Sequence, residues 1–142
     1  MIPKPSKRTK KPRKPLRKKS TKTERKRLMA LAVATFNEYI RKKYPACFDC
    51  GSPAEPTCGH LITAKKESTR FDEMNCFRQT RGCNFRHEHQ PEIYTRAYIQ
   101  KFGFQAYEEL ISRSNRLKKH TCEELRGIID TYRGKLKSLE SA

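Results

Sequence analysis

The organisation of this chain follows from residues 47–89, CFDCGSPAEPTCGHLITAKKESTRFDEMNCFRQTRGCNFRHEH. This stretch holds five of the six cysteines and three of the four histidines. Its chemically distinctive pieces are, in order, Cys47-x2-Cys50, Gly59-His60, Asn75-Cys76, and Cys83-Asn84 followed by His87, Glu88 and His89. Thiolates and imidazoles are ligands that zinc prefers. We therefore expect a zinc-stapled core at about residues 47–90.

The composition indicates one modest domain with a small core. The chain has 142 residues, of which 35% are hydrophobic and 34% charged, and its mean hydropathy is -0.97. A core of this size gains from a structural metal. No run approaches the roughly 18 apolar residues of a membrane span, and the N-terminus lacks the apolar segment of a signal peptide. We therefore expect an intracellular protein with no membrane partner and with reduced cysteines that are available to a metal.

The N-terminal segment is strongly basic. Residues 1–27 hold 14 of the 33 lysine and arginine residues and one acid, Glu24, which gives +13 of the net charge of +18. We expect residues 1–22 to form a disordered arm attracted to nucleic acid, because phosphate neutralisation releases counterions. A solubilising tail or a patch for anionic membranes is the alternative. The residues expected to contact nucleic acid are Lys10, Lys11, Arg13, Lys14, Arg17, Lys18 and Lys19 in the arm, and Lys65, Lys66 and Arg70 in the core.

Hydrophobic spacing predicts an α+β domain over residues 23–142. Apolar residues recur every three or four positions from Leu28 to Ile40, and Tyr44-Pro45 should end that helix. A hairpin and a short helix are then expected, followed by C-terminal helices over about residues 91–140. The expected elements are a helix to about residue 43, strands at 58–64 and 75–81 around a loop at 65–69, a helix from about 84, and helices at 91–102, 104–114 and 122–139.

The cysteines suggest one structural zinc site. Cys47 and Cys50 are separated by two residues, so both can reach one tetrahedral metal, and Cys83 is the firmest third ligand. The fourth ligand stays open between Cys76 and Cys58. The alternative is that these cysteines are small buried apolar residues.

The same stretch carries the residue types that phosphodiester hydrolysis needs. Such a reaction requires a nucleophilic water, an acceptor for its proton and stabilisation of charge on the phosphate. His60 on a strand can be the base, and a nearby helix can offer ligands to a catalytic divalent ion. Asn75, Asn84 and His87 follow in a suitable order. The alternatives for His60 are a histidine satisfied in a small core and a zinc ligand.

From about Phe36 to Leu139 the chain resembles the phage NinG (Rap) recombination nucleases. The resemblance rests on Cys47-x2-Cys50-Gly51, Gly59-His60, Arg70-Phe71-x-Glu73-x-Asn75, Gln79, Cys83-Asn84, Tyr94, Gly103 and the tail from Thr121 to Lys137. It implies a His-Asn-His (HNH) fold, a ββα hairpin and helix around a metal, that nicks branched DNA such as D-loops and Holliday junctions. The local plan is also similar to the endonuclease VII group of phages.

The resemblance also implies roles for individual residues. His60 would be the general base, Asn84 would hold the catalytic magnesium or manganese, and Asn75 would orient the loop and the base. His87 is added as a metal ligand from helix geometry, because it lies three residues after Asn84. Recombination proteins and a second copy of the chain are further expected partners. A phage-encoded protein of this kind would act in the cytoplasm of the host cell.

Two positions depart from related nucleases. Family members usually have a second Cys-x2-Cys pair, which would place a cysteine where this chain has Thr80. Related nucleases often have an aspartate metal ligand immediately before the catalytic histidine, and here that residue is Gly59.

Two other functions compete with the nuclease. One is a non-catalytic, zinc-stabilised module that binds nucleic acid, in which His60 is structural. The other is an interaction protein whose helices dock a recombination or replication partner.

Overall fold

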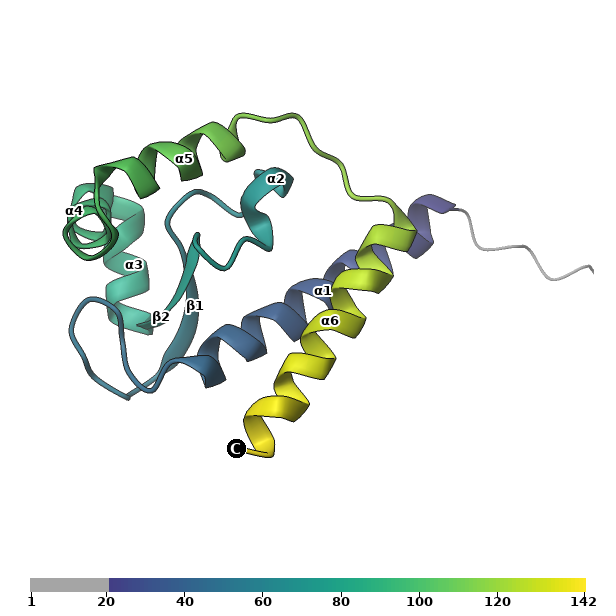
Figure 1. Cartoon of the computed structure of the whole chain (residues 1–142), viewed down its shortest axis with the longest axis horizontal. Coiled ribbons are helices and arrows are strands. Elements are labelled where there is room, and N and C mark those ends of the chain that lie inside the picture. Colours follow the sequence, from purple (N-terminus) through teal and green to yellow (C-terminus); the bar gives the residue numbers. More distant parts are fainter. Residues whose placement is uncertain (1–20) are drawn as a thin grey trace, which may run out of the picture.

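The structure is a computed structural model that describes residues 21–142. Nearly all of the expected arm, including its seven predicted nucleic-acid contacts, lies outside the described residues. The elements are α1 (Thr21–Lys43), β1 (Pro56–His60), α2 (Glu67–Arg70), β2 (Cys76–Thr80), α3 (Arg81–His89), α4 (Pro91–Phe102), α5 (Phe104–Ser114) and α6 (Cys122–Glu140). Helices with a two-stranded sheet make up the described chain, in agreement with the α+β prediction (Figure 1).

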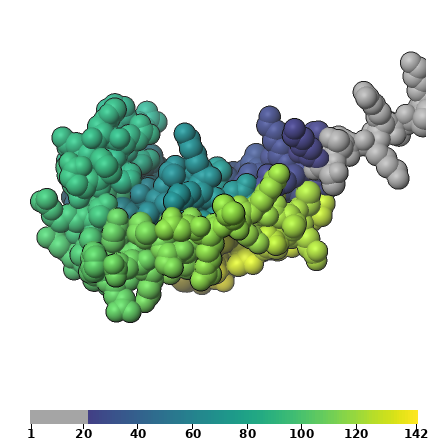
Figure 2. All heavy atoms as spheres, turned by 90° about the horizontal axis from the view of Figure 1, so that it is seen from above, coloured from purple at the N-terminus to yellow at the C-terminus, as the bar shows by residue number. Residues whose placement is uncertain are grey.

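α1 and α6 pack side by side, although they are far apart in the sequence (Figures 1 and 2). Two ion pairs show that the helices run in the same direction. Glu24 pairs with Arg126 near their starts, and Lys42 Nζ lies 3.9 Å from Glu140 Oε1 near their ends. Their apolar faces meet in the core. The buried residues of these faces are Leu28, Ala32, Phe36, Tyr39 and Ile40 from α1, and Leu125, Ile129 and Tyr132 from α6.

The hairpin of β1 and β2 divides the core into two sides. The strands are antiparallel and His60 pairs with Cys76 in their register. Side chains alternate between the faces of a strand, so Cys58, His60 and Cys76 face one way. Cys58 and Cys76 pack in the cluster of Phe36 and α6. On the other face, Phe77 packs with residues of α4 and α5.

The largest local difference from the sequence prediction is at residues 65–69. A loop was expected there, and the structure has the short helix α2 followed by a turn. β1 ends at His60, because Asn75 takes over the hydrogen bonds that follow: its carbonyl accepts from the Leu61 amide and its side-chain oxygen from the Ile62 amide, at 2.9 and 2.7 Å. None of the helices in the range 21–142 is long and apolar enough to cross a membrane.

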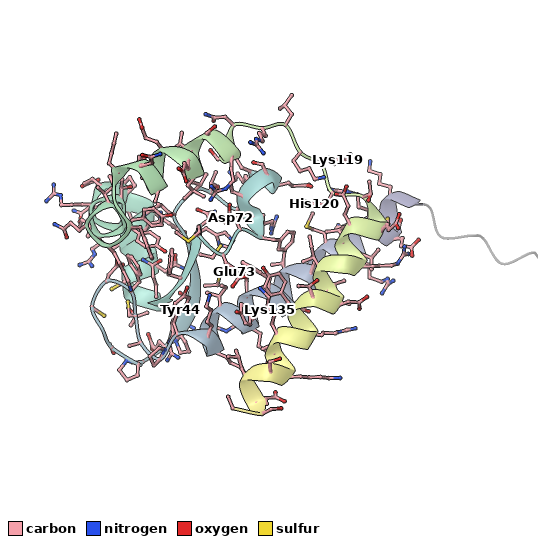
Figure 3. All side chains as sticks on the ribbon, viewed as in Figure 1. Tyr44, Asp72, Glu73, Lys119, His120 and Lys135 are labelled. Carbon is pink, nitrogen blue, oxygen red and sulfur yellow. The ribbon has the colours of Figure 1, made fainter. Side chains whose placement is uncertain are left out.

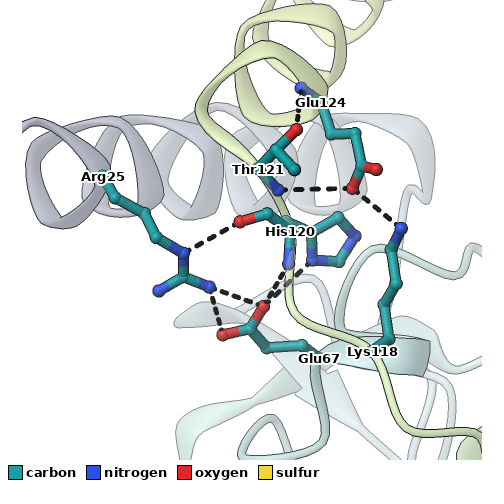
Figure 4. A network of polar contacts seen from close by, with 6 residues as sticks. All are labelled: Arg25, Glu67, Lys118, His120, Thr121 and Glu124. Carbon is teal, nitrogen blue, oxygen red and sulfur yellow. Dashed lines mark hydrogen bonds and ion pairs between the residues drawn. The ribbon is translucent and has the colours of Figure 1, made fainter. Parts of the chain in front are cut away.

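Glu67 anchors α2 to two distant segments (Figure 4). Arg25 of α1 donates two hydrogen bonds to its carboxylate, at 2.6 and 2.8 Å, and a third at 2.8 Å to the carbonyl of His120. The His120 amide donates to the same carboxylate at 2.8 Å. The next residue, Thr121, begins α6 with the expected capping box, in which Glu124 is the partner. Contacts that join residues so far apart explain why a local pattern did not predict α2.

A second carboxylate, Glu73, joins the hairpin loop to both long helices (Figure 3). It accepts from Lys43 at 3.1 Å, from Lys135 at 2.5 Å and from the Tyr132 hydroxyl at 3.2 Å. Burial alone would raise the pKa of Glu73, but the hydrogen bonds and charges of Lys135 and Lys43 outweigh it and lower the pKa from 4.5 to about 2. The charged form of Glu73 therefore stabilises the fold.

We expect Glu73→Gln to destabilise the protein by on the order of 2 kcal/mol at neutral pH, a value reduced for partial solvent screening. A carboxyl with a lowered pKa contributes stability above its unfolded pKa and loses that contribution as pH falls toward its folded pKa. The difference between variant and wild type should therefore shrink below about pH 4.5 and vanish near pH 2. Chemical unfolding across this pH range measures it.

Glu140→Gln is the matched control, because Glu140 is exposed and lies 3.9 Å from Lys42. It should change the free energy of unfolding by less than about 0.5 kcal/mol at any pH. Equal effects of the two substitutions would contradict the role given to Glu73.

Candidate metal centres and active site

The structure brings together the three cysteines that the sequence assigns to zinc. The sulfur atoms of Cys47, Cys50 and Cys83 all lie within 4.8 Å of one another. Gly51, at φ +73°, makes the tight turn after the first pair, and its amide donates to the Cys47 carbonyl at 3.0 Å. Cys83 stands in the first turn of α3. Three thiols in this arrangement can hold a metal such as zinc.

The surroundings of this centre favour the thiolate form of Cys47 but not that of Cys83. Burial works to raise the pKa of the Cys47 thiol, but amide donors at Cys50, Thr80 and Asp49 outweigh it and lower the pKa. Burial raises the pKa of Cys83 to about 11. The Arg86 guanidinium lies 3.7 Å from the Cys83 sulfur. Donors around the sulfurs are the outer-shell partners usually found at a zinc–thiolate centre.

The structure places neither of the two expected candidates for the fourth zinc ligand in this group. Neither Cys76 nor Cys58 belongs to it, because both are in a second group described below. Thr80 stands beside two of the three cysteines instead. Its amide bonds Cys47, and its hydroxyl accepts from the Cys83 amide at 3.2 Å and bonds the Cys83 thiol. The position where the resemblance implies a cysteine is therefore next to the candidate ligands, but it holds the N-cap residue of α3.

The second group contains Cys58, His60 and Cys76, whose ligand atoms also lie within 4.8 Å of one another. Cys76 is fully buried, and the other two are half-buried. The His60 Nε2 is 3.0 Å from the carbonyl of Arg70, which is also 3.8 Å from the Cys76 sulfur. Burial lowers the pKa of His60, and the charge of Arg70 adds to that effect. His60 is therefore mainly neutral at pH 7.

Asn75 is fully buried and holds the loop between the strands. Its side-chain nitrogen donates to the carbonyls of Ile62 and Thr69 at 3.1 and 3.0 Å, and its oxygen accepts from the Ile62 amide. These bonds connect the end of β1 with α2, which carries Arg70 and its carbonyl contact to His60. The side chain of Asn75 thus positions the loop beside His60.

His87, one of the ligands that the sequence predicted for a catalytic cation, lies on the other side of the hairpin. The His87 ring packs against Tyr94 with ring centroids 4.8 Å apart, and the Tyr94 hydroxyl donates to the Gly59 carbonyl at 3.2 Å. Asn84 lies one turn earlier on α3. Within residues 21–142, no hydrogen bond connects His60 with Asn84 or His87. The structure thus brings His60 together with two thiols on one face, and His87 together with Tyr94 on the other.

Several buried polar atoms on this second side have no hydrogen-bond partner in the described chain, namely Asp49 Oδ1, Gln79 Oε1, His87 Nδ1 and the Tyr98 hydroxyl. Gln79 is fully buried, and its Nε2 donates to the other oxygen of Asp49 at 2.6 Å. Buried acceptors without a donor are costly, and a bound cation satisfies them. Sequence reasoning missed Asp49 and Gln79 as candidate ligands, although Asp49 lies inside the Cys47-x2-Cys50 motif.

Arg70 connects the His60 region to a basic groove. This groove has a volume of about 870 Å³, and its lining includes no acidic residue. The basic lining residues are Lys22, Arg25, Lys26, Arg70 and Lys119, and the apolar ones are Met29, Ala30, Val33 and Cys122. Of the other two predicted contacts in the core, Lys65 is exposed and Lys66 donates to Asn115 at 3.2 Å. Sequence reasoning did not foresee Lys119, because its proximity to α1 depends on the α1–α6 packing.

Comparison of the sequence with known proteins identifies a matching family and similar phage proteins. The family model described as "Bacteriophage Lambda NinG protein" matches residues 3–141. "Protein ninG" of Escherichia phage 933W is 33% identical over 116 residues, which are 78% of this chain and 57% of that protein. "Protein ninG" of Escherichia phage lambda is 31% identical over 116 residues, which are 78% of this chain and 56% of that protein. The chain thus spans little more than half the length of these relatives, and no solved structure matches it. Because the family match covers nearly every residue, the chain belongs to the NinG family.

Proposed function

We propose that this protein is a metal-dependent endonuclease that hydrolyses phosphodiester bonds in branched DNA during phage recombination. Membership of the NinG family supports the proposal, together with the hairpin and helix that follow the Cys47-x2-Cys50 turn. His60 would be the general base. It suits that role because a base must be unprotonated near neutral pH, and burial lowers its pKa.

The observation that carries the proposal is the position of Arg70. Its carbonyl contacts His60 at 3.0 Å, while its side chain lines the groove that has five basic residues and no acid. A guanidinium binds two phosphate oxygens at once, so a DNA backbone in the groove would pass beside the candidate base. The apolar floor around Met29 and Val33 would contact sugars or unstacked bases.

The remaining residues divide into two roles. Asn75 would keep the loop and Arg70 in register with His60. Asn84 and His87 would hold a magnesium or manganese ion, together with the unpartnered oxygens of Asp49 and Gln79. Such an ion, when bound, would stabilise the charge that develops on the phosphate.

One observation favours a second function, a zinc-stabilised module that binds nucleic acid without cutting it. His60 is on the hairpin face of Cys58 and Cys76, with its ring 6.5 Å from that of Phe36, whereas His87 packs against Tyr94 with Phe77 on the other side. In that case His60 would serve structure, and the groove would serve binding alone.

Cleavage of labelled Holliday junctions and D-loops with magnesium or manganese distinguishes the two functions. We expect His60→Ala to lower the single-turnover rate by about 10²- to 10⁴-fold, the usual contribution of a general base, with DNA binding retained. His89→Ala is the matched control, because His89 is an exposed histidine at the end of α3. Binding without cutting by the wild-type protein on all substrates and with both metals would instead support the binding module.

A further inference from the structure

We propose that Cys58, His60 and Cys76 form a second metal site, which takes zinc and is separate from the centre at Cys47, Cys50 and Cys83. Two thiols and one imidazole are a donor set typical of zinc and cobalt and a poor one for magnesium or calcium. Their ligand atoms lie within 4.8 Å of one another, as do those of the first group.

The hairpin holds these donors in place before any metal arrives. Cys58 and His60 are two positions apart on β1, so they share a face, and Cys76 of β2 is directly opposite His60. Ligands on paired strands are held more rigidly than ligands on loops. Phe36, Tyr39 and Ile40 of α1 pack on the same side and limit the freedom of the side chains. The site is therefore preorganised, and binding requires little rearrangement of the backbone.

The surroundings of the site also favour a metal. The carbonyl of Arg70 lies 3.0 Å from His60 and 3.8 Å from the Cys76 sulfur, and a backbone carbonyl is a common outer-shell partner of a metal-bound histidine. Simple core packing would not require three ligand atoms to converge, because apolar contacts have no such directionality. Three protein ligands leave a fourth position for water or another group.

Zinc at this site would regulate the proposed nuclease, and this consequence rests on the proposed function. A histidine that ligates a metal cannot accept a proton from water at the same time, because both uses need the same lone pair. Zinc occupancy and general-base catalysis by His60 are therefore mutually exclusive. The endonuclease would be active with magnesium or manganese when the second zinc site is empty, and inactive when zinc fills it.

Metal counting on the reduced full-length protein tests the site without reference to activity. We expect native mass spectrometry to find two zinc ions per wild-type chain, and cobalt titration to show thiolate-to-metal absorption with two equivalents. Cys58→Ala and His60→Ala should each bind one zinc ion. The zinc affinity of the second site should fall by more than roughly 100-fold, the loss that removal of an outer-shell partner can cause. Cys122→Ala, at a half-buried cysteine outside both groups, should still bind two.

Circular dichroism keeps the test decisive if a variant fails to fold. Cys58→Ser provides a second variant, because Cys58 is half-buried and tolerates a hydroxyl better than the buried Cys76. One metal in the wild type, two metals in a folded Cys58 variant, or a Cys58–Cys76 disulfide in the protein purified under reducing conditions would each overturn the proposal.

The regulatory consequence has its own readout. Given cleavage by wild-type protein that carries one zinc ion, a second equivalent of zinc should reduce the magnesium-dependent rate by at least tenfold. In Cys58→Ala, the ratio of the rates without and with added zinc should approach one. Equal inhibition in both proteins would reject the regulation. An absence of cleavage by protein that carries a single zinc ion would reject the proposed function and leave the metal count as the test of the site.

Discussion

Replacing Thr80 with cysteine is expected to raise the zinc affinity of the Cys47, Cys50 and Cys83 centre by at least about 100-fold, or about 2.8 kcal/mol. The reason is that the Thr80 backbone amide bonds Cys47 and its side-chain hydroxyl bonds the Cys83 thiol, so the side chain at position 80 lies beside this centre. A thiol there would supply the fourth sulfur of a tetrahedral set. Competition with a chromophoric chelator measures the affinity. Thermal unfolding should show the same gain in the presence of zinc.

Without zinc the same substitution should be destabilising. The Thr80 hydroxyl caps α3 by accepting from the Cys83 amide at 3.2 Å, and loss of such a cap costs about 0.5–2 kcal/mol. Thr80→Ala removes the cap and adds no ligand, so it should be destabilising with or without zinc. Thr80→Ser keeps the cap and should resemble the wild type. If Thr80→Cys and Thr80→Ala behave alike in zinc, position 80 does not face the metal.

Gly59→Ala is expected to destabilise the protein by roughly 3 kcal/mol, because it overpacks a buried site and disturbs a buried hydrogen bond. A Cβ at position 59 would lie 1.8 Å from Gln79 Oε1 and 2.5 Å from its Cδ. Gln79 cannot move away freely, since it is fully buried and its amide donates to Asp49 at 2.6 Å. Guanidinium unfolding of the variant measures the loss.

A double-mutant cycle identifies the clash as the cause. Gln79→Ala removes the obstructing atoms, so Gly59→Ala should cost much less in that background than in the wild type. Gly127→Ala in α6 is the matched control, because a Cβ there meets nothing within 4 Å and alanine favours a helix. It should stabilise by up to about 1 kcal/mol. Additive effects of the changes at 59 and 79 would contradict the steric explanation.

The same contact explains one departure from related nucleases. An aspartate at position 59 would clash with Gln79 more severely than an alanine, because it has the same Cβ and a carboxylate beyond it. Gln79 and Asp49 instead place unpartnered oxygens on that side of the hairpin. The glycine before His60 is thus linked to the glutamine on the neighbouring strand, and the two positions should be changed together in any redesign.

Much of the helical framework could be predicted from the sequence, because its signals are local. Proline and glycine mark the ends of α4, and α5 spans the residues that its apolar spacing predicted. The Cys47-x2-Cys50 spacing likewise predicts two ligands of one centre. The grouping of Cys58 with Cys76 could not be foreseen, because it depends on strand register and on the face that α1 covers. The partners of Asp49 and of Glu67 depend on contacts across the fold in the same way.

The parallel pairing of α1 and α6 has a consequence for folding of this protein during its synthesis on the ribosome. α1 ends at Lys43 and α6 begins at Cys122, so the apolar stripe of the first helix emerges long before the segment that will cover it. Loop closure over such a separation is slow, and an uncovered stripe invites aggregation or capture by chaperones. Chains that stop before α6 should therefore be cleared by proteases, and only chains that include α6 should accumulate.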